Sequence, residues 1–152
     1  MIYKMPQGGR RRVKELKTDI EFRNAFFIMK QLRPYLEEEH FLEAIERMRQ
    51  NDGYQLFAWI DDDGQYVMIA GLKFQENLYD RYHLWLDDLV TDETKRSQGN
   101  GKKALVDIER FAKRQGASKV VLSSGLSRKQ AHSFYENKMN YGKKSYVYFK
   151  KL

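Results

Sequence analysis

The sequence of 152 residues contains no cysteine and only two prolines. A chain without cysteine has no disulfide, no thiolate zinc site and no cysteine nucleophile. No apolar run approaches the roughly 18 residues that a membrane-spanning helix needs. The start of the chain, Met1–Arg12, is basic but lacks the apolar stretch of a signal peptide. We therefore expect a cytoplasmic protein with no metal site and no membrane partner.

Nothing in the composition divides the chain into parts. Apolar residues make up 41% and charged residues 32%, which is ordinary for a globular protein. Internal repeats, low-complexity tracts and linkers rich in proline or glycine are all missing from the sequence. We predict a single domain over residues 1–152, in which residues 1–12 form a basic, flexible N-terminal arm.

The net charge of +7 is unevenly distributed along the chain. Residues 19–94 contain 7 basic and 17 acidic residues, whereas residues 95–152 contain 15 basic and 3 acidic residues. The C-terminal third should attract a polyanion, and the acidic middle should attract a cation. A nucleic-acid binder has less reason to place an acidic block beside its basic one, so nucleic acid is not the expected partner.

Local signals predict one α+β domain. Thr18 and Glu21 form a capping box before a helix that Pro34 should end, and a second helix is predicted over residues 38–50. A third and a fourth helix are predicted at residues 101–115 and 129–138. Strands are predicted at residues 13–17, 54–60, 66–74, 83–91, 119–123 and 145–150. The order β-α-α-β-β-β-α-β-α-β predicts a mixed, mostly antiparallel sheet of six to seven strands flanked by helices.

The loop Arg96–Gly101 is the strongest functional signal. It follows a predicted strand, and Gly99 and Gly101 lie at the start of a predicted helix. A helix N-terminus exposes unpaired N–H groups and a partial positive charge, and glycines let an anion approach them closely. Lys102 and Lys103 oppose the helix dipole in the first turn, which makes sense if an anion is bound there.

Two common phosphate motifs do not fit this loop. A P-loop needs glycine where Arg96 stands and Ser or Thr where Lys103 stands. A dinucleotide fingerprint needs a third glycine, but position 104 is alanine. Taken alone, Gly99-x-Gly101 is a weak signal, and a glycine-rich turn that simply opens a helix is the alternative.

A second segment makes the pattern specific. Arg96-x-x-Gly99-x-Gly101 resembles the coenzyme A signature R/Q-x-x-G-x-G/A of the GCN5-related N-acetyltransferases, the GNAT family. The downstream run from Ser124 to Tyr135 resembles the family's N-x-x-A-x-x-F-Y segment. The resemblance is good over residues 54–152 and covers residues 13–50 only in layout. It implies the acyl-CoA N-acyltransferase fold and an acetyl-CoA-dependent N-acetyltransferase.

The resemblance also implies where acetyl-CoA would bind as co-substrate. Backbone groups of Leu89, Val90 and Thr91 would pair with pantetheine, and the N–H groups of Gln98–Lys102 would hold the pyrophosphate. We expect Gln98 and Asn100 to contribute only backbone groups. The matched cofactor positions in the two motifs are Arg96, Ser97, Gln98, Gly99, Asn100, Gly101, Lys102, Arg128, Ala131 and Phe134. Arg128 replaces the family's asparagine, and it is open whether it contacts cofactor, contacts substrate or caps the helix.

Tyr135 matches the family's general acid, although it could also be a core aromatic beside Phe134. The general base is expected from Asp87 or Asp88 on the preceding strand. Strand neighbours point to opposite faces, so only one of the two should line the cleft, and we favour Asp87. Either carboxylate could instead serve as a counter-ion, and His83 on the same face is a fallback base.

The sequence does not name the acceptor. The acidic middle favours a primary amine on a small molecule, such as a polyamine, an amino acid or an aminoglycoside. Acetylation of a protein lysine or N-terminus is the alternative within the same chemistry. A coenzyme-binding module without turnover, or a nucleic-acid binder using Arg10–Arg12, is the alternative from another class. Trp85, Tyr79 and Tyr82 either form an aromatic wall around the acceptor or pack within the domain, and a homodimer is left open.

Overall fold

The computed structural model describes residues 12–152, so the predicted N-terminal arm lies outside the described residues apart from Arg12. The chain divides after Val121 into two compact units, and the single domain over residues 1–152 stays a prediction. The elements of the first unit are β1 (Arg12–Leu16), α1 (Asp19–Leu32), α2 (Glu38–Asp52), β2 (Gln55–Ile60), β3 (Tyr66–Asn77), β4 (Arg81–Thr91), η1 (Glu93–Lys95), α3 (Asn100–Arg114) and the start of β5 (Val120–Leu122). The second unit contains α4 (Lys129–Ser133) and η2 (Phe134–Lys138).

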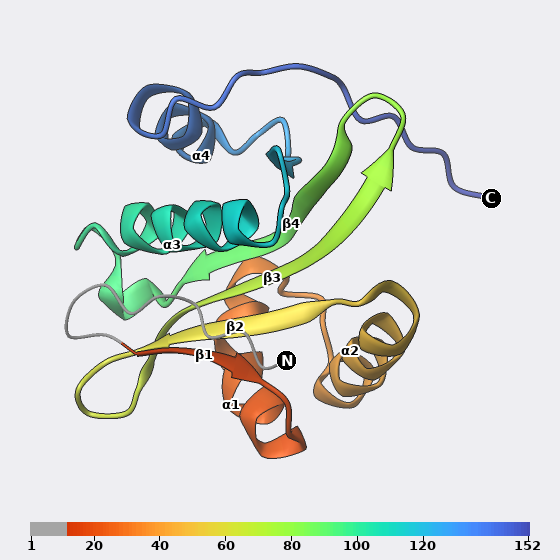
Figure 1. Ribbon diagram of the computed structural model, residues 1–152. Helices are drawn as coiled ribbons and strands as arrows, with labels where there is room; N and C mark the ends of the chain where they lie inside the picture. Colours follow the sequence, from red (N-terminus) through yellow and green to blue (C-terminus); the bar gives the residue numbers. More distant parts are fainter. Residues whose placement is uncertain (1–11) are drawn as a thin grey trace. The chain divides into compact units, whose positions relative to one another are not determined.

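The sheet has the strand order β1-β2-β3-β4-β5 (Figure 1). The first four strands form an antiparallel meander, in which β2 and β3 pair from Gln55 opposite Leu72 to Ile60 opposite Tyr66. The chain then crosses over through α3 to reach β5, which is the type of connection that a parallel pair requires. This arrangement confirms the predicted α+β class.

Helices of the first unit cover both faces of the sheet. Side chains of α1 and α2, including Phe26 and Ile45, form a buried cluster with Leu56, Ile69 and Val90 of the strands. On the opposite face α3 packs through Phe111, whose ring lies 5.6 Å from those of Phe57 and Phe74. The first face therefore belongs to α1 and α2, and the second face belongs to α3 (Figure 1).

Local sequence signals set the start and end of α1. The Thr18 hydroxyl accepts the Glu21 N–H, and the Glu21 carboxylate accepts the Thr18 N–H, which is the predicted capping box. The helix ends at Leu32, and Arg33 leaves the helical region with φ −129° and ψ 79°, as expected for a residue before proline. Within residues 12–152 every helix is too short or too polar to cross a membrane.

Three expectations need correction. The predicted strand at residues 145–150 has no strand pairing, so the sheet in the described residues has five strands rather than six to seven. The alternating pattern there is apolar on both sides, and a strand also requires a hydrogen-bonded neighbour; Tyr148 is 89% exposed. The segment 75–81, which lies between the strands predicted at residues 66–74 and 83–91, is mostly strand rather than loop, because β3 and β4 pair as far as Asn77 opposite Arg81. The last helix changes from α to π geometry at Phe134.

Candidate functional site

The end of β4 is fixed by a tight turn. The Asp92 carboxylate accepts the Thr94 N–H at 3.0 Å and the Thr94 hydroxyl at 3.1 Å. The Lys95 N–H then donates to the Asp92 carbonyl at 2.8 Å, which closes η1. The chain leaves the sheet at a defined point, directly before the loop that the sequence singles out.

The loop Arg96–Gly99 is closed at its base by Asn100. The Asn100 side-chain amide donates to the Lys95 carbonyl at 2.8 Å, and Asn100 is 4% exposed. Its side chain therefore has a structural role in closing the loop, which leaves the backbone N–H of Asn100 as the group expected to face the cofactor. Ser97 and Gly99 both have positive φ, at 62° and 73°. Turns that combine left-handed and right-handed residues form concave arrays of N–H groups that bind anions.

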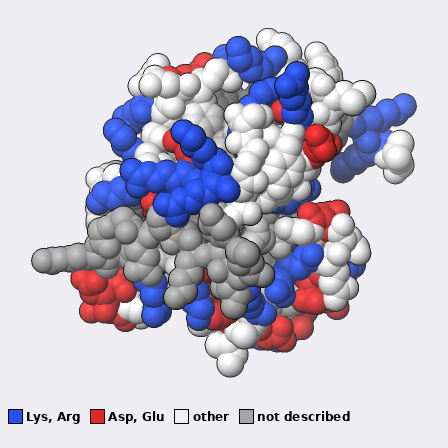
Figure 2. All heavy atoms as spheres, viewed as in Figure 1, with Lys and Arg blue, Asp and Glu red and all other residues white. Residues whose placement is uncertain are grey.

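The first turn of α3 continues this anion-binding character. The first closing bond of the helix runs from the Lys103 N–H to the Gly99 carbonyl, and the first turn contains no acidic side chain. Figure 2 shows Lys and Arg gathered over α3. The exposed residues of α3 are all basic: Lys102, Lys103, Arg110, Lys113 and Arg114. The loop and helix start fit a polyanionic cofactor such as coenzyme A.

A β-bulge lies in β4 at the carboxylate pair. Gly71 of β3 pairs with Asp88, but the next residue, Leu72, pairs with Leu86, so Asp87 is the extra residue. Asp88 bonds to Tyr54, which belongs to the cluster that α1 and α2 bury, and Asp87 contacts Lys73, which shares a face of β3 with Ile69 of that cluster. The expectation that only one of the two can point to this face is wrong, because the bulge interrupts the alternation of side chains.

Asp88 is buried and bonded at both carboxylate oxygens. The Arg33 Nε donates to Oδ1 at 2.8 Å, and the Arg33 Nη2 lies 2.8 Å from the same oxygen in an ion pair. The Tyr54 hydroxyl donates to Oδ2 at 2.7 Å. Asp88 is 7% exposed, so this carboxylate is held in place and has little room for a substrate.

Asp87 has a different environment. The Trp85 indole N–H donates to its Oδ1 at 3.0 Å, and the Lys73 ammonium lies 3.8 Å from its Oδ2. Oδ2 is buried and has no hydrogen-bond partner among the described residues. Burial raises the pKa of Asp87 above its ordinary value; Lys73 opposes this shift, and the neighbouring Asp88 adds to it. A half-buried carboxylate with a raised pKa and an oxygen that accepts no hydrogen bond is suited to proton transfer.

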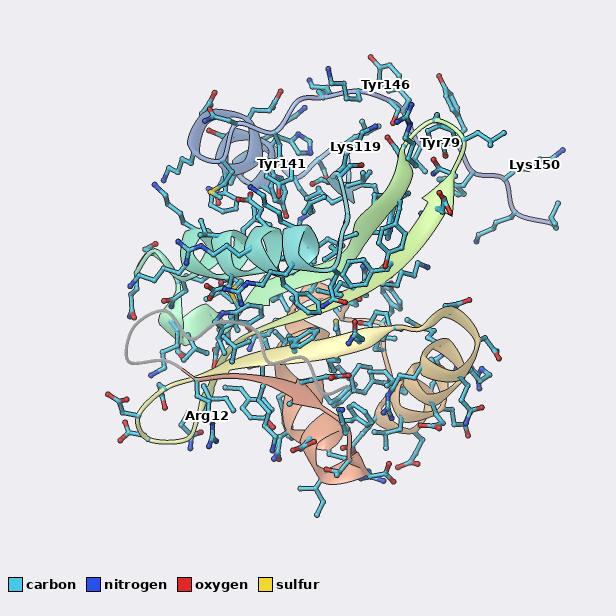
Figure 3. The ribbon with its side chains drawn as sticks, viewed as in Figure 1. Arg12, Tyr79, Lys119, Tyr141, Tyr146 and Lys150 are labelled. Atoms are coloured by element: carbon cyan, nitrogen blue, oxygen red, sulfur yellow. The ribbon has the colours of Figure 1, made fainter. Side chains whose placement is uncertain are left out.

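The other residues of β4 are occupied by packing. His83 is fully buried; one ring nitrogen lies 2.7 Å from the Arg81 carbonyl and the other lies 3.1 Å from the Gln75 amide. The Tyr82 ring stacks on Phe74, on the face that α3 covers, so Tyr82 does not form a wall with Trp85. Lys119 donates to the carbonyl of the exposed Tyr79 at 3.4 Å in the β3–β4 turn (Figure 3).

The second unit contains the remaining motif residues. Arg128 is the N-cap residue of α4 but makes no side-chain capping bond, and its aliphatic stem lies over Gly125. Tyr135 lies in the π turn η2, and such turns are frequent at functional sites. Burial raises the pKa of Tyr135, and Arg128 opposes part of this shift. The phenol therefore stays protonated at neutral pH, as a proton donor must.

The structure brings Asp87 and Asp88 together with Arg33, Tyr54 and Lys73, three residues that the sequence reasoning missed. Gly71 carried a usable signal for this site, because an isolated glycine within an apolar strand indicates a bulge or a close backbone approach. Tyr135 and Arg128 belong to the second unit. Among residues 12–152 there is no group of three or more His, Asp and Glu side chains that could hold a metal ion.

Comparisons with known proteins agree on one family. The model of the acetyltransferase (GNAT) family matches residues 20–141. The uncharacterized N-acetyltransferase YhdJ of Bacillus subtilis (strain 168) is 36% identical over 138 residues, which are 91% of this chain and 96% of that protein.

Solved structures share the fold. The aminoglycoside 6'-N-acetyltransferase of Acinetobacter baumannii has a TM-score of 0.75 at 15% identity and covers 93% of this chain and 98% of its own. An aminoglycoside N-acetyltransferase in complex with CoA has a TM-score of 0.79 at 14% identity, with 96% and 97% covered. At these identities the likeness concerns the fold.

Proposed function

This chain belongs to the acetyltransferase (GNAT) family, and from that premise we propose that it moves an acetyl group from acetyl-CoA directly to a primary amine of a small molecule. The proposal rests on which residues β4 contains and on where the strand leads. One strand presents the half-buried Asp87 carboxylate and then leads, through Leu89–Thr91, into the anion-binding loop at the start of α3. A proton acceptor and a cofactor site are thus joined by a few residues of rigid strand.

We assign the cofactor contacts by the family match. Leu89, Val90 and Thr91 would pair with the pantetheine arm, and the loop Arg96–Gly101 with Lys102 would hold the pyrophosphate. The positive φ values at Ser97 and Gly99 and the basic first turn of α3 support this assignment. In the second unit the proposed cofactor contacts are Arg128, Ala131 and Phe134.

Asp87 and Tyr135 have complementary proposed roles. Asp87 takes the proton of the acceptor ammonium, and the free amine then attacks the thioester carbonyl. The new N–C bond forms as the C–S bond breaks, and Tyr135 gives its proton to the leaving thiolate. The nitrogen, which carries one proton too many after the attack, returns a proton through water to the Tyr135 phenolate. The raised pKa values of both groups support these roles, since the base needs a pKa closer to neutrality and the acid must remain protonated.

A small-molecule amine is the preferred acceptor. The acidic stretch of residues 19–94 favours a cationic ligand, and Asp87 and Asp88 lie on the face of the sheet that belongs to α1 and α2. Two structural neighbours are named for aminoglycoside acetylation, which supports an acceptor of this kind. Acetylation of a protein lysine or N-terminus uses the same chemistry and is tested alongside it.

The first test combines calorimetry with a thiol-release screen. We expect acetyl-CoA to bind with a Kd below about 1 mM, and free thiol to appear when the correct amine is supplied. The panel contains polyamines, amino acids, aminoglycosides and peptides. Turnover with peptides alone would favour the protein-acetylation alternative, and binding without any thiol release would indicate a module without turnover. Absence of acetyl-CoA binding would refute the proposal.

The Tyr135→Phe substitution tests the proposed acid. We expect kcat to fall about 100-fold, because the thiolate then leaves without a proton donor. The Kd for acetyl-CoA should stay within about twofold, since the ring and its contact with Phe134 remain. Tyr148→Phe is the matched control, because Tyr148 is 89% exposed in the same unit. If kcat of Tyr135→Phe equals that of the control, Tyr135 is not the acid.

A further inference from the structure

Three separate segments converge on Asp88. Arg33 follows the end of α1, Tyr54 precedes β2, and Asp88 itself lies in β4. The hydrogen bonds from Arg33 and Tyr54 to Asp88 join residues that are 55 and 34 positions apart in the sequence. We call Arg33, Tyr54 and Asp88 the Asp88 cluster. Its bonds are charge-assisted, which makes them stronger than bonds between neutral groups.

The Asp88 cluster also contacts the main chain of the bulge. The Nη2 of Arg33 donates to the Asp87 carbonyl at 3.1 Å, and the Nε of the same guanidinium donates to the Asp88 carboxylate at 2.8 Å. Asp87 is the extra residue in β4 and has no pairing residue in β3. One guanidinium therefore fixes both the main chain of the bulged residue and the side chain of the next residue. This geometry is available to the planar, multidentate Arg but not to Lys.

Gly71 leaves the space that the Asp88 cluster occupies. A Cβ at this position would lie 1.7 Å from the Tyr54 hydroxyl oxygen and 2.7 Å from Asp88 Oδ2. Any larger residue would displace the Tyr54 ring or the carboxylate. The strand opposite the bulge is thus shaped to admit the hydroxyl that completes the cluster.

We propose that the Asp88 cluster is a positioning device that holds the β4 bulge and so aims the Asp87 carboxylate at the acceptor amine. The inference rests on the proposed function, in which Asp87 is the base. Asp88 keeps its place through Arg33 and Tyr54, whereas Asp87 keeps an oxygen without a hydrogen bond. The two neighbouring carboxylates therefore have separate tasks, one in positioning and one in proton transfer.

The groups that face Asp87 come from three sides. Lys73 lies on β3, Arg33 follows α1, and Asp88 is next to it on β4. Arg33 and Lys73 lower the pKa of Asp87, whereas the charge of Asp88 raises it. Removing the Arg33 charge should therefore raise the pKa of Asp87, and it should also release the bulge.

The test uses Arg33→Met and Arg33→Lys in the full chain. The Asp87 carboxyl is followed by ¹³C NMR titration without substrate, with assignment from Asp87→Asn. Turnover is followed with the amine found in the panel. For Arg33→Met we expect a higher Asp87 titration midpoint and a kcat about 30-fold lower, because small misplacements of a reacting group are costly. The acidic limb of the pH–kcat profile should move to higher pH, and KM for acetyl-CoA should stay within about twofold.

Arg33→Lys separates charge from geometry. It keeps the positive charge but cannot make both bonds, so we expect kcat to be about tenfold lower with a smaller change of the Asp87 midpoint. Arg47→Lys is the matched control, because Arg47 is exposed on α2 and pairs with Glu43 at 3.8 Å on the same helix. If Arg33→Met does not fold, Tyr54→Phe replaces it, since it keeps the ring and loses only the bond to Asp88; its kcat should fall about fivefold with KM unchanged.

The outcomes separate the inference from the proposed function. If the Asp87 midpoint and kcat of Arg33→Met match those of the wild type, the positioning role is wrong, whatever the base. If Tyr54→Phe, used in its place, has a wild-type kcat and pH profile, the role is wrong as well. If Asp87→Asn keeps full turnover, the base assignment fails, and the catalytic purpose of the Asp88 cluster fails with it even where the midpoint shifts.

Discussion

Replacing Asp87 with asparagine should lower kcat for acetyl transfer about 1,000-fold, because general base catalysis contributes on this scale and an amide cannot take the proton. The Asn side chain has nearly the same shape, and its carbonyl can still accept the Trp85 indole N–H, which lies 3.0 Å from Asp87 Oδ1. Acetyl-CoA affinity should therefore change less than about threefold. Steady-state kinetics and calorimetry measure the two quantities.

Asp62→Asn is the control for this substitution. Asp62 is exposed in the β2–β3 turn, so the same loss of charge occurs away from the proposed site. Its kcat should equal that of the wild type. An Asp87→Asn variant that keeps more than about a third of the wild-type kcat would rule out Asp87 as the base.

The pH dependence follows from the same residue. Burial raises the pKa of Asp87, so kcat should rise with pH through a midpoint above the ordinary aspartate value of 3.8. Because the folded pKa lies above the unfolded pKa, the fold favours the protonated form of Asp87. The contribution of Asp87 to the free energy of unfolding is fully present at a pH below its unfolded pKa, and it is lost as the pH rises through its folded pKa.

Stability at neutral pH therefore distinguishes lost chemistry from lost structure. The ionised Asp87 carboxylate should disfavour the folded state there, and Asp87→Asn should unfold at a higher urea concentration than the wild type. A variant that is more stable and far less active has lost a reacting group. A variant that is less stable and less active would point to a structural role for Asp87.

Short-range patterns were enough for much of the fold and for the family. The Thr18–Glu21 capping box and the helical spacing after it fixed α1 within a residue or two. The two motifs, Arg96–Gly101 and Phe134–Tyr135, indicated the GNAT family, and the family match over residues 20–141 confirms it. Membership of this family also confirms the expectation of an acetyl-CoA-dependent N-acetyltransferase. These signals are local, so one sequence carries them in full.

The arrangement around Asp88 depends on long-range contacts. Alternation along a strand predicted opposite faces for Asp87 and Asp88, but a bulge set by the pairing with Gly71 puts both on one face. In the sequence, Arg33 appears only as the residue before Pro34 at the end of a helix. No local pattern links it to Asp88, which lies 55 positions further along the chain. Contacts of this kind follow from how the elements pack.

Phe111 connects the core to the cofactor loop. It lies in α3, is 2% exposed, and packs edge-on against Phe57 of β2 and Phe74 of β3 at 5.6 Å. The same helix begins at the anion-binding loop. These ring contacts therefore hold α3, and with it the backbone N–H groups of the loop, against the sheet.

Phe111→Ala should lower the free energy of unfolding by about 3–5 kcal/mol, because removing a buried ring loses its transfer free energy and leaves a cavity between α3 and the sheet. Urea denaturation measures the loss. Phe27→Ala is the matched control; Phe27 is 72% exposed on α1, and the free energy of unfolding should change by no more than about 0.5 kcal/mol. A loss below about 1 kcal/mol for Phe111→Ala would mean that other contacts hold α3 on the sheet. The expected large loss would show that this core position holds α3, whose N-terminus follows the proposed cofactor loop, against the sheet.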